Sequence, residues 1–578
     1  MKKLTILTVC LALYVSNCFA QWTTGGTQIS FTATNNNRPF VSAAAKGSYY
    51  VTWVATDTNT VSTALNKIKI AGYDSTGTIL AGWKTGGDTT THDNGDYYAP
   101  QIITCENGNV IVTWFGYAAG SNRSHIYAQK YSSNGVAQWN SGNPVQVSTG
   151  TSFIDEYPMV ITDRHNGAYL AWTRFDSTIA PSSADVYLQH IDSAGNVAAG
   201  WNPNATGVAT TKGLREFYPK LSLTPDQSSV YVVYPAGLIG ATSLILKKYT
   251  ATNGSLAAGW SASGVTISTG PNVYPEINHD LSLYADNSNN ALVVWVEARY
   301  TGNGEIYMQQ INPSGAVLLA ANGEYLFGDS TGLANGIDYV QVIQEADKNL
   351  LIAYNNLVNF NDVAAMKVKP NGTILWNDSL ITTGGKSAYP YPALDGKNGV
   401  YLFYVNTNSP EKLYALAIDS NGTKYKGWTV PGSLFGTMSD YDGFNPNYDV
   451  NATATNPLEA VVAWNRQVGK LFNIYTCNLL SNGSNCQSPN GINEISNTAD
   501  TYTLFPNPAN DNVTVRSNSY EGNKTITIYN IVGQEINTIE SPIKEVAINT
   551  SQLDPGMYFV TIKEIATNRN YTFKLIKK

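Results

Sequence analysis

Residues 157–201 read YPMVITDRHNGAYLAWTRFDSTIAPSSADVYLQHIDSAGNVAAGW. Within this stretch, residues 186–191 alternate apolar and polar side chains with a period of two, which is typical of a half-buried strand. Asn166-Gly167 supplies the positive φ angles of a tight hairpin between two apolar runs. A turn at Gly195 then leads to Trp201 and a last short strand. The stretch therefore predicts four antiparallel strands joined by hairpin turns.

The same pattern recurs along the chain, which we divide into units 1 to 8. The second strand of each unit ends in an aromatic residue, at Trp53, Trp114, Trp172, Tyr234, Trp295, Tyr354, Tyr404 and Trp464. The turn after the third strand carries a glycine, at Gly77, Gly135, Gly195, Gly254, Gly315, Gly372, Gly422 and Gly483. Both markers keep the same register, at intervals of 50 to 62 residues. Four antiparallel strands in a repeat of this length are typical of a β-propeller blade.

The two ends of the repeat region predict how the ring closes. A tryptophan begins the fourth strand of most units, at Trp83, Trp139, Trp201, Trp260, Trp376 and Trp428. The fourth strand is missing after Gly483 in unit 8, whereas residues 22–30 have its pattern and no unit before them. We expect this N-terminal strand to complete unit 8, so that no sheet edge is left free. The predicted fold is all-β, an eight-bladed β-propeller, with seven blades and an irregular segment as the alternative.

Composition excludes several classes of protein. Of the 578 residues, 43% are hydrophobic and 13% are charged, compared with a usual charged share of about 25%. The formal net charge is -7, which provides no basic field for a phosphate backbone, so we expect no nucleic-acid partner. With 49 glycines, 24 prolines and 37 tyrosines, the chain is rich in turns and aromatic rings, as β structure requires.

The N-terminus predicts secretion. Lys2 and Lys3 precede a short apolar run over residues 4–15, and residues 18–20 form a small-x-small cleavage site, so residues 1–20 are predicted to be a signal peptide. No other stretch approaches 18 apolar residues, and we expect no membrane span in the mature chain. Cys477 and Cys486 flank a predicted strand and turn, and we expect them to form a disulfide in an oxidising compartment.

The C-terminal part breaks the repeat. Residues 21–487 hold the repeat units, residues 488–503 are polar and turn-rich and read as a linker, and residues 504–578 hold short alternating strands. The strand pattern of this last part predicts a small β-sandwich.

Residues 504–578 also carry a set of motifs in a fixed order. They are the Phe-Pro-Asn-Pro motif with Pro506, Asn507 and Pro508, then Gly533, Gly556 and Tyr558, and the terminal Lys574, Lys577 and Lys578. These residues resemble the type A C-terminal sorting domain of cargo exported by the type IX secretion system of Bacteroidetes. The resemblance implies passage to the periplasm by the Sec pathway, recognition by the translocon and sorting machinery, and export to the cell surface or the medium.

Tyrosines and carboxylates recur just before the predicted first strand of the units, and these are the candidate ligand-binding residues. They are Tyr98, Asp155, Glu156, Tyr157, Glu216, Tyr218, Tyr274, Glu276, Tyr339 and Tyr391. If each first strand lines the central axis, these side chains lie at one mouth of a channel. Tyrosine rings stack on sugar faces and carboxylates bind hydroxyls or a divalent cation. The alternative is that Tyr-Pro fixes the start of the strand and packs between blades.

We therefore predict a secreted or cell-surface propeller that binds a glycan or a surface protein. A glycan-active hydrolase or lyase is the first alternative, and a glycosidase would need two carboxylates about 5–9 Å apart. Acids at repeating positions favour binding over catalysis, so no catalytic residue is assigned. A structural or adhesive surface protein is the second alternative. We expect no cofactor, and a structural calcium ion remains open.

Overall fold

The computed structural model describes two parts of the chain with gaps. The described residues are 26–30, 34–57, 65–91, 93–150, 152–176, 183–238, 241–269, 280–298, 304–328, 336–357, 362–378, 382, 387–406, 412–425, 428, 433–437, 450–456, 459–468, 471–480, 502–518, 520, 522–530, 534–565 and 570–578. Outside the described residues lie the predicted signal peptide, most of the predicted linker, and the residues Tyr274, Glu276, Cys486 and Gly533. Two compact units are present, residues 1–488 and residues 489–578.

Units 1 to 7 each form four antiparallel strands in chain order. Units 1 and 2 consist of β2 (Thr34–Ala43), β3 (Tyr49–Asp57), β4 (Asn66–Tyr73), β5 (Asp88–Thr89), β6 (Asp96–Thr104), β7 (Val110–Tyr117), β8 (Ser124–Tyr131) and β9 (Val145–Gln146). Units 3 and 4 consist of β10 (Ile154–Thr162), β11 (Ala168–Asp176), β12 (Ser183–Ile191), β13 (Thr206–Ala209), β15 (Lys220–Leu223), β16 (Ser229–Leu238), β17 (Ala241–Thr250) and β18 (Val265–Ser268). The short strand β14 (Arg215–Glu216) joins these two sheets, because it pairs with both β12 and β16.

The later units repeat this order. Units 5 and 6 consist of β19 (Leu281–Ala285), β20 (Ala291–Glu297), β21 (Glu305–Ile311), β22 (Glu324–Gly328), β23 (Ile337–Gln344), β24 (Leu350–Asn356), β25 (Asp362–Val368) and β26 (Ile374–Asp378). Units 7 and 8 consist of β27 (Ser387–Leu394), β28 (Val400–Asn406), β29 (Lys412–Ile418), β30 (Ser433–Thr437), β31 (Val450–Asn456), β32 (Glu459–Val468) and β33 (Leu471–Leu480). Two single-turn 3₁₀ helices, η1 (Ala45–Gly47) and η2 (Asn140–Gly142), are the helical elements of the described residues.

The N-terminal strand completes unit 8. Strand β1 (Thr27–Gln28) pairs antiparallel with β33, with Thr27 opposite Thr476 and Gln28 opposite Tyr475. This is the pairing that the sequence predicts. It gives the last sheet the order β1-β33-β32-β31 and brings residues more than 440 positions apart into one hydrogen-bonded ladder.

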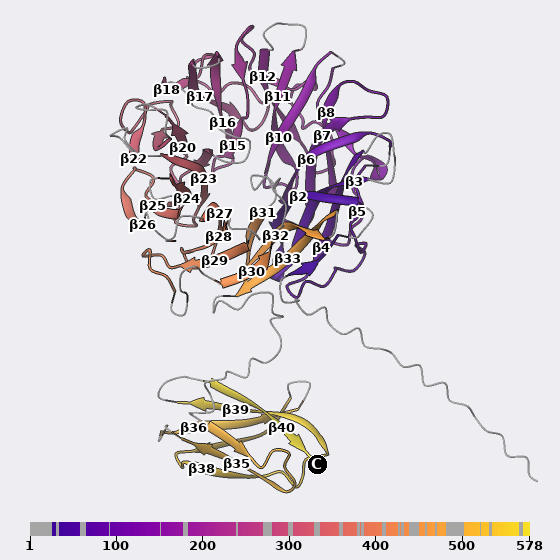
Figure 1. The fold of residues 1–578 in the computed structure, drawn as a ribbon, viewed down its shortest axis with the longest axis vertical. Coiled ribbons are helices and arrows are strands. Elements are labelled where there is room, and N and C mark those ends of the chain that lie inside the picture. Colours follow the sequence, from indigo (N-terminus) through magenta and orange to yellow (C-terminus); the bar gives the residue numbers. More distant parts are fainter. Residues whose placement is uncertain are drawn as a thin grey trace, which may run out of the picture. The chain divides into compact units, whose positions relative to one another are not determined.

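The first strands of the units form the inside of the arrangement. Each contacts the first strand of the next unit, from β2 through β6, β10, β15, β19, β23 and β27 to β31, and β31 contacts β2. Figure 1 shows the sheets placed around a common centre. The apolar core lies between neighbouring sheets, as where Ala171 and Leu188 of unit 3 pack with Val230 and Val232 of unit 4.

A tryptophan links each sheet to the next at five junctions. The tryptophans that the sequence assigns to the start of the fourth strand precede that strand by a few residues, except Trp376, which lies in β26. The indole N–H of each donates to a main-chain carbonyl in the third-strand turn of the following unit, at 2.9 to 3.0 Å. The pairs are Trp83 with Ser133, Trp139 with Ser193, Trp201 with Ala251, Trp260 with Pro313, and Trp376 with Ser420. The glycine of the same turn lies against the tryptophan ring at these junctions. A methyl group on Gly195 would lie 2.5 Å from the ring of Trp139.

The C-terminal unit has its own core. It consists of β34 (Tyr502–Phe505), β35 (Asn512–Ser517), β36 (Lys524–Tyr529), β37 (Glu535–Ser541), β38 (Glu545–Asn549), β39 (Gly556–Glu564) and β40 (Asn570–Lys577). Its sheets have the orders β34-β35-β38 and β37-β36-β39-β40. Apolar side chains of both sheets, such as Val513 and Val560, form one buried cluster.

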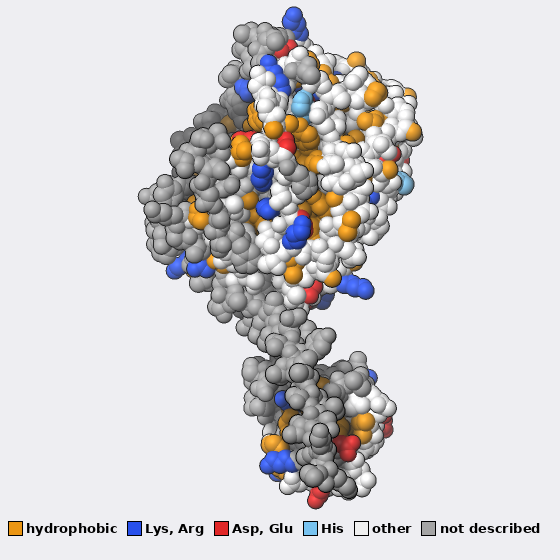
Figure 2. All heavy atoms as spheres, turned by 90° about the vertical axis from the view of Figure 1, so that its right-hand side faces the viewer, with side chains coloured by type: hydrophobic (Ala, Val, Ile, Leu, Met, Phe, Trp, Pro, Cys, Tyr) orange, Lys and Arg blue, Asp and Glu red, His pale blue; other side chains and the backbone are white. Residues whose placement is uncertain are grey.

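Charge is sparse on the molecular surface in view in Figure 2. Lysine, arginine, aspartate and glutamate side chains are scattered among uncharged groups there and are not gathered into one basic field. In the described part of the chain, no helix is long and apolar enough to cross a membrane.

The tryptophan–turn contact predicts the effect of Gly195→Ala on stability. Gly195 has a φ of 89° and Gly213 has a φ of 84°, but nothing lies within 4 Å of a methyl group on Gly213. Both alanine variants must adopt a left-handed backbone, which costs about 1 kcal/mol. In Gly195→Ala, the clash with Trp139 adds about 1–3 kcal/mol. Urea unfolding of the mature chain measures the difference, and equal losses in the two variants would show that the ring contact contributes nothing.

Candidate functional site at the bulged ends of the inner strands

Five of the described inner strands, β2, β6, β10, β23 and β27, carry a β-bulge near their first residues. The register of pairing with the second strand shifts at Asn37/Phe40, Tyr98/Gln101, Glu156/Met159, Asp338/Gln341 and Ala388/Tyr391. The bulges hold residues at positive φ, namely Arg38, Ala99, Tyr157, Tyr339 and Tyr389, and Tyr218 has the same conformation between β14 and β15. The sequence predicts Tyr-Pro just before each first strand. The structure places Tyr157-Pro158 inside β10 and Tyr389-Pro390 inside β27, whereas Tyr218-Pro219 directly precedes β15, as predicted. Proline lacks an N–H, so it fits inside a strand where a bulge interrupts the ladder.

The bulge tyrosines of units 3 and 4 pack edge to face. The ring centroids of Tyr157 and Tyr218 lie 5.2 Å apart at 84°, and those of Tyr157 and Phe115 lie 5.4 Å apart at 66°. Tyr98 stacks on Phe115 at 5.6 Å and donates a hydrogen bond to Asp96. The result is a chain of rings that runs from unit 2 to unit 4. Tyr157 and Tyr218 are half-buried, so part of each side chain faces solvent.

Asp155 is a structural anchor of this end of unit 3. Its side chain is fully buried and accepts hydrogen bonds from Arg174 Nε at 2.6 Å, from Arg174 Nη2 at 3.0 Å and from Trp172 Nε1 at 3.0 Å. Burial by itself raises the pKa of Asp155, but His125 and the Arg174 guanidinium outweigh burial and hold the pKa below its ordinary value. Asp155 therefore stays ionised and bound to Arg174, and it is not available to a ligand.

Three other carboxyl groups at this end have raised pKa values. Burial raises the pKa of Glu156, whose Oε1 accepts a hydrogen bond from Tyr117 at 3.2 Å. Burial also raises the pKa of Glu216, whose Oε2 accepts a hydrogen bond from the Thr211 N–H at 3.0 Å. Burial and the Glu216 carboxylate raise the pKa of Asp185 to about 6. A carboxyl group with a pKa of about 6, as Asp185 has, can hold a proton at mildly acidic pH and donate it to an oxygen.

Other predicted residues lie away from this group. Tyr339 and Tyr389 of units 6 and 7 pack edge to face at 5.3 Å, and Tyr339 is fully buried. Tyr391 lies one residue beyond the bulge of β27 and is half-buried. Tyr274 and Glu276 lie outside the described residues. Of the predicted residues, the structure thus brings together Tyr98, Asp155, Glu156, Tyr157, Glu216 and Tyr218. We call this group, with Asp185, the tyrosine–carboxylate site.

Sequence reasoning missed Asp185, Arg174 and Tyr117. Asp185 lies directly opposite Arg174 in the β11–β12 ladder, and Tyr117 ends β7 of the preceding unit. The available signal was that Asp185 and Arg174 have no charged counterpart at the matching positions of unit 2, where Gly116 pairs with His125.

The described residues test the metal and disulfide predictions only in part. Within the ranges that the structure describes, no group of three or more His, Cys, Asp or Glu side chains is placed to hold a metal ion. Cys477 is disulfide-bonded and Cys105 is a buried free thiol. The partner predicted for Cys477, Cys486, lies outside the described residues, so that pairing stays a prediction.

Asn507 ties the C-terminal motifs together. Its amide donates to the carbonyl of Lys574 and accepts from the N–H of Ile576 at 2.8 Å, and the N–H of Lys578 donates to the carbonyl of Ala509 at 2.9 Å. The Phe-Pro-Asn-Pro motif is therefore hydrogen-bonded to the backbone of the lysine-rich last strand.

Residues 503–578 match the family model of the secretion system C-terminal sorting domain. These residues are a type IX secretion sorting domain. The protein is accordingly exported by the type IX secretion system to the cell surface or the extracellular space.

Solved structures resemble the chain at low identity, and no curated protein matches its sequence. The GH93 α-L-arabinofuranosidase of Fusarium graminearum has 12% identity and a TM-score of 0.33, covering 61% of this chain and 98% of its own. A PL25 ulvan lyase has 10% identity and a TM-score of 0.37, covering 82% and 98%. The endo-arabinase of Bacteroides thetaiotaomicron VPI-5482 has 15% identity and a TM-score of 0.28, covering 59% and 96%.

The raised pKa of Asp185, about 6, predicts a pH-dependent stability. The value in the unfolded chain is about 3.9, so the contribution of Asp185 to stability is fully present below that pH and is lost as the pH rises through 6. Asp185→Asn should therefore raise the free energy of unfolding at pH 7 by about 1 kcal/mol, allowing for solvent screening, and change it little at pH 4.

Urea unfolding at a series of pH values tests this prediction. Asp192→Asn is the control, because Asn can also accept the hydrogen bonds that Asp192 receives from the N–H groups of Ala194 and Asn196. A difference between Asp185→Asn and the wild type that stays constant from pH 4 to pH 7 would contradict the assignment.

Proposed function

We propose that residues 21–487 form an eight-bladed β-propeller. Two observations support the proposal. The first strands contact one another in an unbroken series that returns from β31 to β2. Strand β1 supplies the fourth strand of unit 8 by pairing with β33. We further propose that a signal peptide of residues 1–20 is removed before export.

We infer that this secreted propeller binds a glycan at the tyrosine–carboxylate site. The observation that carries the inference is that half-buried rings and carboxyl groups from units 2 to 4 meet at one end of the inner strands. Tyr157 and Tyr218 offer partly exposed apolar faces. Glu156 lies beside Tyr157 in the chain and is also half-buried, so its carboxylate is available to sugar hydroxyls. Stacking combined with carboxylate hydrogen bonds is how proteins hold a polar ligand with apolar faces.

Acid–base catalysis on the bound glycan is the second candidate function. The observation that favours it is that burial and the Glu216 carboxylate raise the pKa of Asp185 to about 6, and that burial raises the pKa of Glu216. A glycosidase or lyase needs one carboxyl group that holds a proton and a second group that acts as base or nucleophile. Glu216 and Asp185 are the pair that we would assign to these roles.

An oligosaccharide array probed with the mature protein tests both candidates. We expect binding that weakens about tenfold or more in Tyr157→Ala and in Glu156→Gln, because each loses a direct contact with the ligand. Tyr157→Phe keeps the ring and should keep most of the affinity. Chromatography of the same mixtures detects shortened products, which should disappear in Glu216→Gln and Asp185→Asn if the protein is an enzyme.

Tyr325→Ala is the matched control for the tyrosine variants. Tyr325 lies on the outer strand β22 and is 40% exposed, far from the bulges in the chain, and its loss should leave binding unchanged. A folded wild-type protein that binds no oligosaccharide would show that the glycan proposal is wrong. A protein ligand or an adhesive surface role would then remain.

A further inference from the structure

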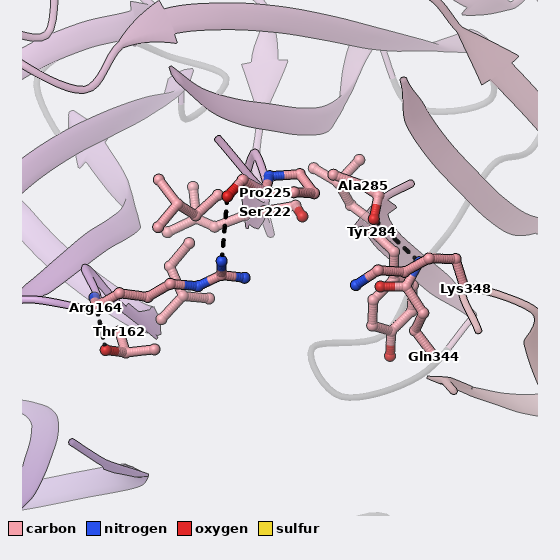
Figure 3. A pocket seen from close by; sticks show the side chains of 12 residues that line it. Thr162, Arg164, Ser222, Pro225, Tyr284, Ala285, Gln344 and Lys348 are labelled. Atoms are coloured by element: carbon pink, nitrogen blue, oxygen red, sulfur yellow. Dashed lines mark hydrogen bonds between the residues drawn. The ribbon is translucent and has the colours of Figure 1, made fainter. Parts of the chain in front are cut away.

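A cavity of about 230 Å³ lies at the other end of the inner strands, in units 3 to 6 (Figure 3). Its walls come from the last residues of β10, from β15 and β19, and from the β23–β24 hairpin. Thr162, which lines the cavity, follows Tyr157 by five residues in β10, a distance of about 17 Å along a strand. The cavity is therefore separate from the tyrosine–carboxylate site.

Two cationic side chains face this cavity. Arg164 lies in the turn after β10 and Lys348 in the turn after β23, and both have positive φ, 61° and 72°. Figure 3 shows the guanidinium and the ammonium group pointing toward one another from opposite walls. In the described parts of the chain, neither forms an ion pair with a carboxylate. The side-chain contact of Arg164 is a long hydrogen bond of 3.4 Å from Nη1 to the carbonyl of Pro225.

Three other polar side chains of the wall are engaged with neighbouring groups, among them the Thr162 hydroxyl, which donates to the Glu106 carboxylate at 2.7 Å. Gln344 Nε2 donates to the carbonyl of Ala285 at 3.1 Å, and the Tyr284 hydroxyl donates to the carbonyl of Val342. Apolar side chains such as Leu221 and Leu283 complete the lining. Arg164 is exposed and Lys348 is half-buried, so both positive charges remain reachable by an anion from solvent. An anion placed between them is attracted by both.

We propose that this cavity binds a small oxyanion, either a carboxylate or a sulfate group, between Arg164 and Lys348. The arginine guanidinium offers parallel N–H groups that match two oxygens of such an anion, and the lysine ammonium acts as a compact charge. The volume is below the range of about 300–1,000 Å³ that is usual for drug-sized ligands, which restricts the occupant to a small molecule or a single charged residue of a chain. The proposal is independent of glycan binding at the opposite end.

Titration calorimetry with the mature full-length protein tests the proposal. The probes are sodium sulfate and sodium D-glucuronate, each against sodium chloride at matched ionic strength, with D-glucose as the neutral counterpart of glucuronate. We expect saturable binding of at least one anion and none of glucose. Binding of only one probe supports the site and identifies the group, sulfate or sugar carboxylate, that it accepts.

Charge-removing variants locate the bound anion. Arg164→Asn and Lys348→Asn should each weaken binding about tenfold, since each removes a charged hydrogen-bond donor. Asparagine tolerates the left-handed backbone of both positions, and Arg164 is exposed, so both variants should fold.

Lys46→Asn is the matched control, because Lys46 is an exposed lysine in the corresponding turn of unit 1 with a φ of 58° and does not line the cavity. It should bind the anion as the wild type does, and so should Glu216→Gln. The proposal is overturned if neither anion binds saturably, if Lys46→Asn weakens binding as much as the two cavity variants, or if Glu216→Gln abolishes it.

Discussion

The contact between a fourth-strand tryptophan and the turn of the next unit is the interaction on which the repeat region depends. At five junctions, the indole N–H finds a carbonyl acceptor in the neighbouring sheet. At the same place the indole ring covers a glycine that any side chain would displace, as with Trp139 over Gly195. Each junction thus gives the indole N–H a hydrogen-bond acceptor and packs the aromatic ring against the next unit. A single unit cannot bury the apolar faces of its sheet without its neighbours. In unit 5, which has no such tryptophan, Gly372 packs near Leu319 instead.

This repeated contact gives the two ends of the inner strands different chemistry. Because the units are placed in the same way, the bulges of β2, β6, β10, β23 and β27 lie near the starts of these inner strands, and the first-hairpin turns lie at the other ends. The bulged end gathers tyrosines and the carboxyl groups of Glu156, Asp185 and Glu216. The turn end gathers Arg164 and Lys348 around an apolar cavity. One architecture therefore presents two surfaces suited to different ligands.

Much of this could be predicted from the sequence, because the repeat markers are local. The strands, the turn glycines and the pairing of the N-terminal strand with unit 8 follow from alternation and from the order of Trp and Gly. The bulges could not be predicted, since an interruption in pairing depends on the partner strand, and Tyr157-Pro158 was placed before the strand instead of inside it. Asp185 was missed because its raised pKa depends on burial and on Glu216, which comes from the connection to the next unit.

A crystal structure of the mature protein with an oligosaccharide selected from the array would show directly whether the bulged ends of the inner strands form the ligand site. Sugar density should lie against the rings of Tyr157 and Tyr218, with hydroxyls within hydrogen-bonding distance of the Glu156 carboxylate. Sugar bound only on the outer strands, for example beside Tyr325, with the bulged ends empty, would contradict this placement of the ligand site.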